Sequence, residues 1–85
     1  MVNAVVPDAE LAERSLGFAR RLAAGPTKAN AATKRMVRAF LEEGVRGADA
    51  RAAEIGAPLF ATRDLRGAVE SFLTEGPGKA TFEGR

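Results

Sequence analysis

The stretch that decides the fold runs from Thr62 to Arg85 and reads TRDLRGAVESFLTEGPGKATFEGR. Its first half predicts one short amphipathic helix, because apolar residues recur at i, i+3, i+4, i+7 and i+8. Thr62 or Asp64 can cap its start, since a short side-chain oxygen accepts from a free amide of the first turn. Gly76-Pro77-Gly78 predicts its end. The apolar stripe consists of Leu65, Ala68, Val69, Phe72 and Leu73.

Residues 76–85 form a polar tail with a single aromatic residue, Phe82. A packed helix followed by such a tail is typical of an arm that lies on another surface. Residue chemistry alone therefore predicts a small helical domain and does not specify an activity.

Length and composition predict one domain, a single helical unit over residues 1–85. A chain of this size is expected to bury roughly 60–65% of its unfolded surface, which leaves a thin core. Hydrophobic residues make up 46% of the chain, too many for a disordered protein. Much of that fraction is alanine, which fills little volume.

Cysteine and histidine are both absent, which excludes disulfides, thiol chemistry and the usual zinc sites. The lack of cysteine is compatible with a reducing cytoplasm, the location we expect. No apolar run approaches the roughly 20 residues that cross a bilayer, and the N-terminus lacks a signal-peptide pattern. A membrane is therefore not an expected partner. The net charge of +2 comes from acids and bases that are interleaved except in the second predicted helix, so a nucleic acid is not an expected partner either.

Residues 1–7 are expected to be extended, because Val2 to Val6 is short and β-branched and Pro7 pushes Val6 the same way. No second strand pattern occurs in the chain. Two interpretations stand equally: a strand whose partner precedes this sequence, or a frayed terminus.

A first helix is predicted from Ala9 to Ala24, capped by Asp8 and stopped by Gly25-Pro26. Gly17 in its middle costs about 1 kcal/mol relative to alanine. It either allows a close helix approach or is a tolerated imperfection. The apolar face contains Leu11, Leu16, Phe18, Ala19, Leu22 and Ala23.

A second helix is predicted from Lys28 to Glu43, capped by Thr27 and ended by Gly44. Its basic cluster is either a patch for anions or nucleotide phosphates, or, as we favour, a solvated helix face. The apolar positions are Ala29, Ala32, Thr33, Met36, Val37, Phe40 and Leu41. The cluster is Lys28, Lys34, Arg35 and Arg38.

A third helix is predicted from Ala48 to Ala61, joined to the second by the short loop 44–47, so that the two are neighbours. Pro58 removes one main-chain hydrogen bond, which predicts a kink near residues 56–58 or a split into two pieces. The predicted fold is therefore all-α, with three to four amphipathic helices, a short extended N-terminus and an irregular C-terminal tail.

Catalytic patterns are absent: no nucleophile with a base, no phosphate-binding glycine loop and no candidate metal ligands are seen. The carboxylates lie mainly at helix ends or on polar faces, where a solvated or capping role is favoured. Glu54 borders the apolar stripe of the third helix, and we interpret it as an ion-pair partner rather than a base.

Three segments in order resemble the enoyl-CoA hydratase/isomerase (crotonase) family across essentially all 85 residues. Residues 2–8, VNAVVPD, resemble the segment that closes the family's core. Gly25-Pro26 with Ala32-Thr33-Lys34-Arg35 resembles the stretch that follows. The family's C-terminal signature is similar to Thr62-Arg63-Asp64, Gly67, Phe72-Leu73 and Phe82-Glu83-Gly84-Arg85.

This resemblance implies the C-terminal helical region of a protein that binds acyl-CoA thioesters and acts in fatty acid metabolism. The family's oxyanion hole and its catalytic glutamates match no residue of this chain, so we assign no catalytic residue and expect the chain alone to be inactive. The only cofactor implied is the coenzyme A moiety of the substrate. The resemblance also implies a homo-oligomer, a trimer or hexamer in the family, or a dimer for this segment alone.

One contact with coenzyme A is implied by the resemblance. Phe72 matches the aromatic residue of the family's last helix, which approaches the adenine and phosphates. Glu75-Gly76 replace the usual Lys-Arg pair, so Lys79 would supply the charge. The alternative for Phe72 is a plain core residue. The alternative for the whole chain is a stand-alone, self-associating helical module with no enzymatic role.

Overall fold

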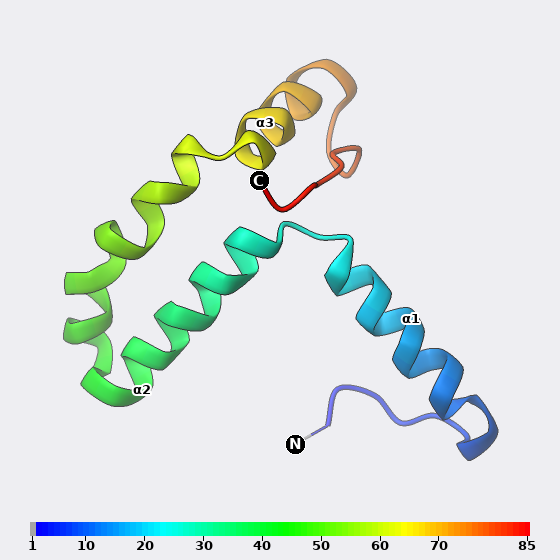
Figure 1. Ribbon diagram of the computed structural model, residues 1–85. Helices are drawn as coiled ribbons and strands as arrows, with labels where there is room; N and C mark the ends of the chain where they lie inside the picture. The colour runs from blue at the N-terminus through cyan, green and yellow to red at the C-terminus, as the bar shows by residue number, and fades with distance from the viewer. Residues whose placement is uncertain (1) are drawn as a thin grey trace.

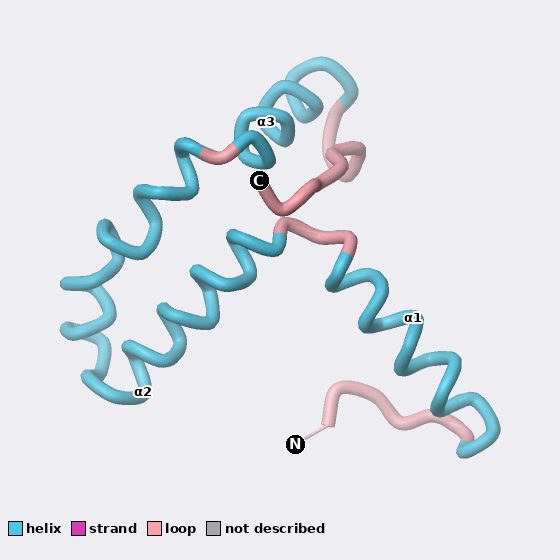
Figure 2. Tube along the Cα trace, in the orientation of Figure 1, coloured by secondary structure: helices cyan, strands magenta, loops and turns pink. Residues whose placement is uncertain are grey.

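The computed structural model describes residues 2–85, and the fold within that range is all-α, as predicted. A 3-10 turn, η1 (Asp8–Glu10), leads into α1 (Leu11–Ala23). A long helix, α2 (Thr27–Gly56), continues as a second 3-10 turn, η2 (Ala57–Ala61), and is followed by α3 (Arg63–Glu75). Figure 1 shows α1 and the first half of α2 diverging from residues 24–26, with α3 at the opposite end of the bent α2. Residues 2–85 contain no strand, and the N-terminal segment up to Pro7 is irregular (Figure 2).

The second predicted helix ends at Gly44, as predicted, since the backbone there is not helical. The predicted loop 44–47 is too long, because the next helix begins directly after Gly44 and the two helices run on as one bent element, α2. Gly44 has φ +73° and ψ −174°, a backbone conformation that side chains disfavour. Gly47 lies on the inside of the bend, where an added Cβ would overlap the Cβ of Glu43. The bend therefore depends on two residues without side chains, and it turns α2 into two adjacent arms (Figure 1).

The predicted break near Pro58 is confirmed, because α2 ends at Gly56 and Ala57–Ala61 winds as a 3-10 turn. Thr62 caps α3, accepting from the amide of Leu65 at 3.2 Å, and Gly76 ends it with φ +86°. Two other predicted caps are wrong. Asp8 makes no capping bond because the chain first winds a 3-10 turn, and Thr27 is itself the first residue of α2, after Pro26.

The core is smaller than expected. Its buried apolar residues are Ala32, Ala39, Ala48 and Ile55, all on the facing sides of the two arms of α2. The chain exposes 7146 Å², against about 4,800 Å² for a compact protein of its mass. Folding thus buries about 45% of the unfolded surface instead of the expected 60–65%.

The overall shape is open. The radius of gyration is 16.2 Å, whereas a compact chain of 85 residues has about 12 Å. The molecule measures 45 × 39 × 19 Å, so its elements lie in a thin layer. Apart from η1, no helix packs extensively on α1. The apolar side of α1 is partly covered by the N-terminal segment, which lines an open hollow of about 330 Å³ together with Leu11 and Phe18.

Candidate functional site

The tail after α3 folds back and binds the start of that helix through Asp64. The Asp64 carboxylate accepts hydrogen bonds from the amides of Glu83 and Gly84, each at 2.8 Å. The amide of Asp64 donates to the carbonyl of Arg85 at 2.9 Å. These three bonds, here called the tail clip, bury the Asp64 side chain and hold residues 83–85 at the junction of α2 and α3.

The electrostatics of the tail clip favour an ionised Asp64. The amide of Glu83 is the main cause that lowers the pKa of Asp64 below its ordinary value of 3.8. Burial acts in the opposite direction, while the other backbone bonds and the positive charge of Lys28 act with the Glu83 amide. The carboxylate at the start of α3 also faces the positive end of the helix dipole. Asp64 is thus a structural anchor for the tail.

Beside the tail clip lies an apolar hollow of about 280 Å³ between the start of α2 and α3. Phe82 reaches it from the tail and is half-buried there. The tail also passes close to α2, since a Cβ at Gly84 would come within 2.9 Å of the Thr27 hydroxyl. Phe82 therefore packs against this chain's own helices. The other apolar residues of the hollow are Pro26, Ala29, Leu59, Leu65 and Ala68.

The two residues predicted to contact coenzyme A lie in different surroundings. Phe72 is 60% exposed on the apolar stripe of α3 and is not a core residue of this chain. Lys79 lines a shallow hollow of about 280 Å³ on the polar side of α3, together with Glu70 and Glu75. Phe72 does not line that hollow, and the two carboxylates oppose a phosphate there. The structure therefore does not bring Phe72 and Lys79 together in one site.

Large apolar side chains remain uncovered on all three helices. On α2, Ala32 and Ala39 face the second arm, and the neighbouring Val37, Phe40 and Leu41 are left open. Leu41 is 75% exposed, beside an open hollow of about 490 Å³. On α3, Val69 and Leu73 are as open as Phe72. On α1 the exposed apolar residues are Leu11, Leu16, Phe18 and Leu22.

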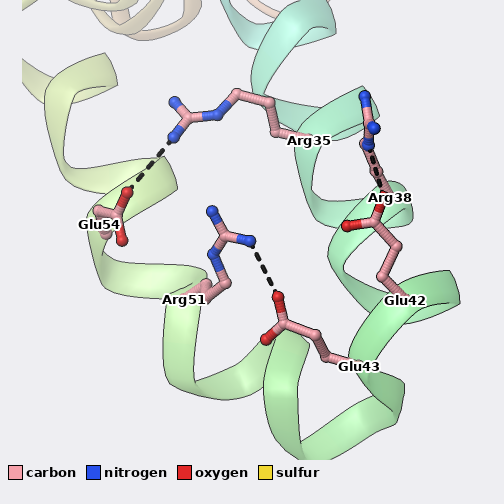
Figure 3. Close-up of polar contacts among 6 residues, drawn as sticks. All are labelled: Arg35, Arg38, Glu42, Glu43, Arg51 and Glu54. Carbon is pink, nitrogen blue, oxygen red and sulfur yellow. Dashed lines mark hydrogen bonds and ion pairs between the residues drawn. The ribbon is translucent and has the colours of Figure 1, made fainter.

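Two of the four residues of the basic cluster on α2, Arg35 and Arg38, pair with carboxylates (Figure 3). Arg38 pairs with Glu42 at 2.8 Å, and this pair raises the pKa of Arg38. Arg35 reaches across to Glu54 on the other arm at 3.5 Å, which confirms the interpretation of Glu54 as an ion-pair partner. Arg51 and Glu43 pair at 3.0 Å near the bend. The cluster is therefore an exposed helix face on which the two arginines are salt-bridged.

Nothing in the described structure resembles a catalytic centre. Among residues 2–85, no three acidic residues lie close enough together to hold a metal ion. In the same range, no helix is both long and apolar enough to pass through a bilayer. The residue that sequence reasoning missed is Asp64, which was expected only as a cap. The signal visible in the sequence is a short carboxylate at the start of a helix, followed by a glycine-containing tail long enough to return to it.

Comparisons of the chain with family models, with curated proteins and with solved structures found no match. The candidate functional feature therefore comes from this chain's own structure. It is the uncovered apolar surface of the three helices, whose arrangement depends on the bend in α2 and on the tail clip.

Proposed function

We propose that this chain is the helical docking region of an enoyl-CoA hydratase/isomerase-like protein of acyl-CoA metabolism in the cytoplasm, and that it contributes to oligomerisation. The family part of the proposal rests on the resemblance of residues 2–8, 25–35 and 62–85. The docking part rests on one observation, the surface that the fold leaves open.

That surface is large for a chain of this size. The molecule exposes about 2,300 Å² more than a compact protein of equal mass. Part of this exposed surface consists of the apolar stripes of the three helices. Contiguous apolar area in contact with water is unfavourable, so these stripes favour binding to a partner. A docking region has this form before its partner covers it.

The chain alone supplies no acid–base pair and no oxyanion hole, so in this proposal the acyl-CoA substrate is handled by other parts of the parent protein. We expect no detectable hydration of crotonyl-CoA by the isolated chain. Turnover at the rates of an enoyl-CoA hydratase would refute this. The coenzyme A contact through Phe72 and Lys79 would need a partner surface that reaches both, because Phe72 is exposed on α3 while Lys79, in the tail, lines a hollow that Phe72 does not reach.

The family assignment is tested by reading the coding sequence immediately upstream. We expect an in-frame, glycine-rich core with two glutamates placed for acid–base chemistry. An upstream sequence without such a core removes the assignment.

A second candidate is a stand-alone, self-associating helical module, which the same uncovered stripes support. Absence of an upstream core together with a stable oligomer in sedimentation would favour this candidate. A well-folded monomer at every concentration would count against it.

A further inference from the structure

We propose that residues 80–85 of one copy of this chain bind to a second copy at the surface that holds the same residues within one chain. That surface, here called the tail site, consists of Asp64 and the apolar hollow beside it. The inference rests on the docking role proposed above and deepens it, because it names both the segment that joins two copies and the surface that receives it. The apolar lining of the hollow is Pro26, Ala29, Leu59, Leu65 and Ala68.

The tail lies on its site as an extended segment. Residues 79–85 form neither helix nor turn, and Figure 1 shows them returning from the far end of α3 to its start. Ala80, Phe82 and Gly84 are half-buried, whereas the residues between them are exposed. An extended chain directs successive side chains to opposite sides, so this period of two is typical of a peptide bound along one edge. The exposed residues are Lys79, Thr81, Glu83 and Arg85.

Two positions of the tail make it selective. Phe82 reaches the apolar hollow. Gly84 has φ +76°, and a Cβ there would come within 2.9 Å of the Thr27 hydroxyl, so a side chain is disfavoured on both counts. The exposed side chains of the tail belong to none of the ion pairs found among residues 2–85. The tail site therefore recognises an extended backbone with an aromatic residue followed two positions later by glycine.

An open tail site favours another tail in the same place. Within residues 2–85, the Asp64 carboxylate accepts hydrogen bonds only from the two amides of the tail clip, and Asp64 is only 7% exposed. Release of the tail removes both donors and exposes the apolar hollow to water, which are both unfavourable. The tail of a second copy restores the same contacts because it presents the same atoms.

The link between α3 and the tail takes no part in this recognition. No hydrogen bond of residues 77–81 is found in the described part of the chain, and Gly76 and Gly78 both have positive φ. The link is therefore a tether, and the tail can form the same bonds with its own chain or with a second copy, as in domain swapping. A short tether corresponds to an effective concentration of the order of 1 mM. A dilute chain thus holds its own tail, and exchange occurs where copies are concentrated or assembled.

The test uses two variants of the full 85-residue chain, neither of which can hold its own tail. Asp64→Ala removes the acceptor and keeps the tail, whereas Gly84→Val keeps the site and places a β-branched residue at positive φ. The Asp64→Ala chain is labelled with ¹⁵N and mixed with unlabelled Gly84→Val chain up to about 1 mM, the effective concentration of the tether. The amide signals of Glu83 and Gly84 in the labelled chain should move from their released positions to those of the unmodified chain.

Two unlabelled partners serve as controls. Gly67→Val is the same substitution at a position where a Cβ meets nothing within 4 Å, and its own tail still occupies its site. It should bind the labelled tail about tenfold more weakly, because only its open fraction is competent. Asp64→Ala/Gly84→Val lacks the acceptor and should leave the labelled signals unchanged. An equal response to all three partners would mean non-specific association and would overturn the proposal.

The role of the aromatic residue is tested in the same mixture. A labelled Asp64→Ala/Phe82→Ala chain should bind the Gly84→Val chain about tenfold more weakly, since it loses the apolar contact with the hollow. Equal binding by the two labelled chains would contradict the recognition of an aromatic residue.

A second measurement applies if either variant unfolds. A synthetic peptide of residues 79–85 is added at several times the ~1 mM effective concentration to the labelled, unmodified chain. It should displace the chain's own tail, so that the signals of Glu83 and Gly84 move to their released positions, whereas a peptide with Gly84→Val should not.

Labelled tails that stay released in the mixture, or an unmodified tail that the peptide does not displace, would overturn the exchange. The docking role is decided separately by sedimentation of the unmodified chain, and the family assignment by the upstream coding sequence. A chain that self-associates without exchanging tails would therefore lose this inference alone.

Discussion

The first helix and the bent second helix differ in what supports them. The arms of α2 bury Ala32, Ala39, Ala48 and Ile55 against each other, whereas α1 has only the N-terminal segment over part of its apolar side. Both have amphipathic sequences. The difference shows that an apolar stripe predicts a helix, but that only a neighbour within reach turns the stripe into a core.

The same contrast appears within α3. Its start is fixed by Thr62 and by the tail clip, and Leu65 and Ala68 line an apolar hollow together with Phe82 and with Leu59 of η2. Its second half presents Phe72 and Leu73 to solvent. The first turn of α3 is therefore held by the rest of the chain, whereas its last turns are exposed to solvent.

The largest expected effect separates the core of α2 from the stripe of α1. Ile55→Ala removes a side chain that is 2% exposed and should lower the free energy of unfolding by about 3 kcal/mol. Leu22→Ala removes one that is 53% exposed and should cost about 1 kcal/mol or less. Urea unfolding at dilutions that favour the monomer measures both. Equal losses would mean that α1 is as well packed as α2.

An intermediate effect is expected at the bend of α2. Gly47→Ala places a Cβ against the Cβ of Glu43 and should destabilise the chain by about 1–3 kcal/mol. Gly67→Ala is the matched control, because a Cβ there meets nothing within 4 Å, and it should stabilise α3 by up to about 1 kcal/mol. Thermal unfolding followed by circular dichroism compares the two. A neutral Gly47→Ala would mean that the arms can separate without loss.

The smallest and most local effect is expected at the tail clip. Because the pKa of Asp64 is lowered in the folded chain, the stability it contributes is fully present above pH 3.8 and is lost as the pH falls through the folded pKa. The amide NMR signals of Glu83 and Gly84 should therefore shift with a midpoint below 3.8.

Two variants check this assignment. Asp64→Asn lacks the titrating carboxylate and keeps one acceptor oxygen, so it should show no such transition and at least one of the two amides should stay at its released position at every pH. Asp49→Asn, at an exposed aspartate, should leave the transition unchanged. A midpoint at or above 3.8 in the unmodified chain would contradict the depressed pKa.

The local features of the fold could be predicted from the sequence, because they depend on residues close together in the chain. The period of Leu65 to Leu73, the Thr62 cap, the stop at Gly76 and the break near Pro58 are of this kind. The bend at Gly44 was predicted as a loop, since a glycine after a polar turn commonly ends a helix. The helix resumes directly after Gly44 because the two arms of α2 contact each other. A local sequence pattern does not show such a contact.

The candidate site was less predictable for the same reason. The tail clip joins Asp64 to residues 83–85, which are 19 to 21 positions away, so a local pattern shows Asp64 only as a cap. The sequence located the apolar residues of each stripe. Which of them would stay open depended on the direction of each helix, set at Gly25-Pro26 and at Gly44. The implied coenzyme A contact stays a prediction.

The tail clip also decides how a mechanical load would enter this molecule. Residues 83–85 are tied to Asp64, so tension applied at Arg85 passes directly to the first turn of α3 and to the adjoining end of η2. The rest of α3 and the Gly76-Pro77-Gly78 turn carry no tension until those three hydrogen bonds break, because the bonds close this part of the chain into a loop. A force applied at Arg85 is therefore carried by the junction of η2 and α3.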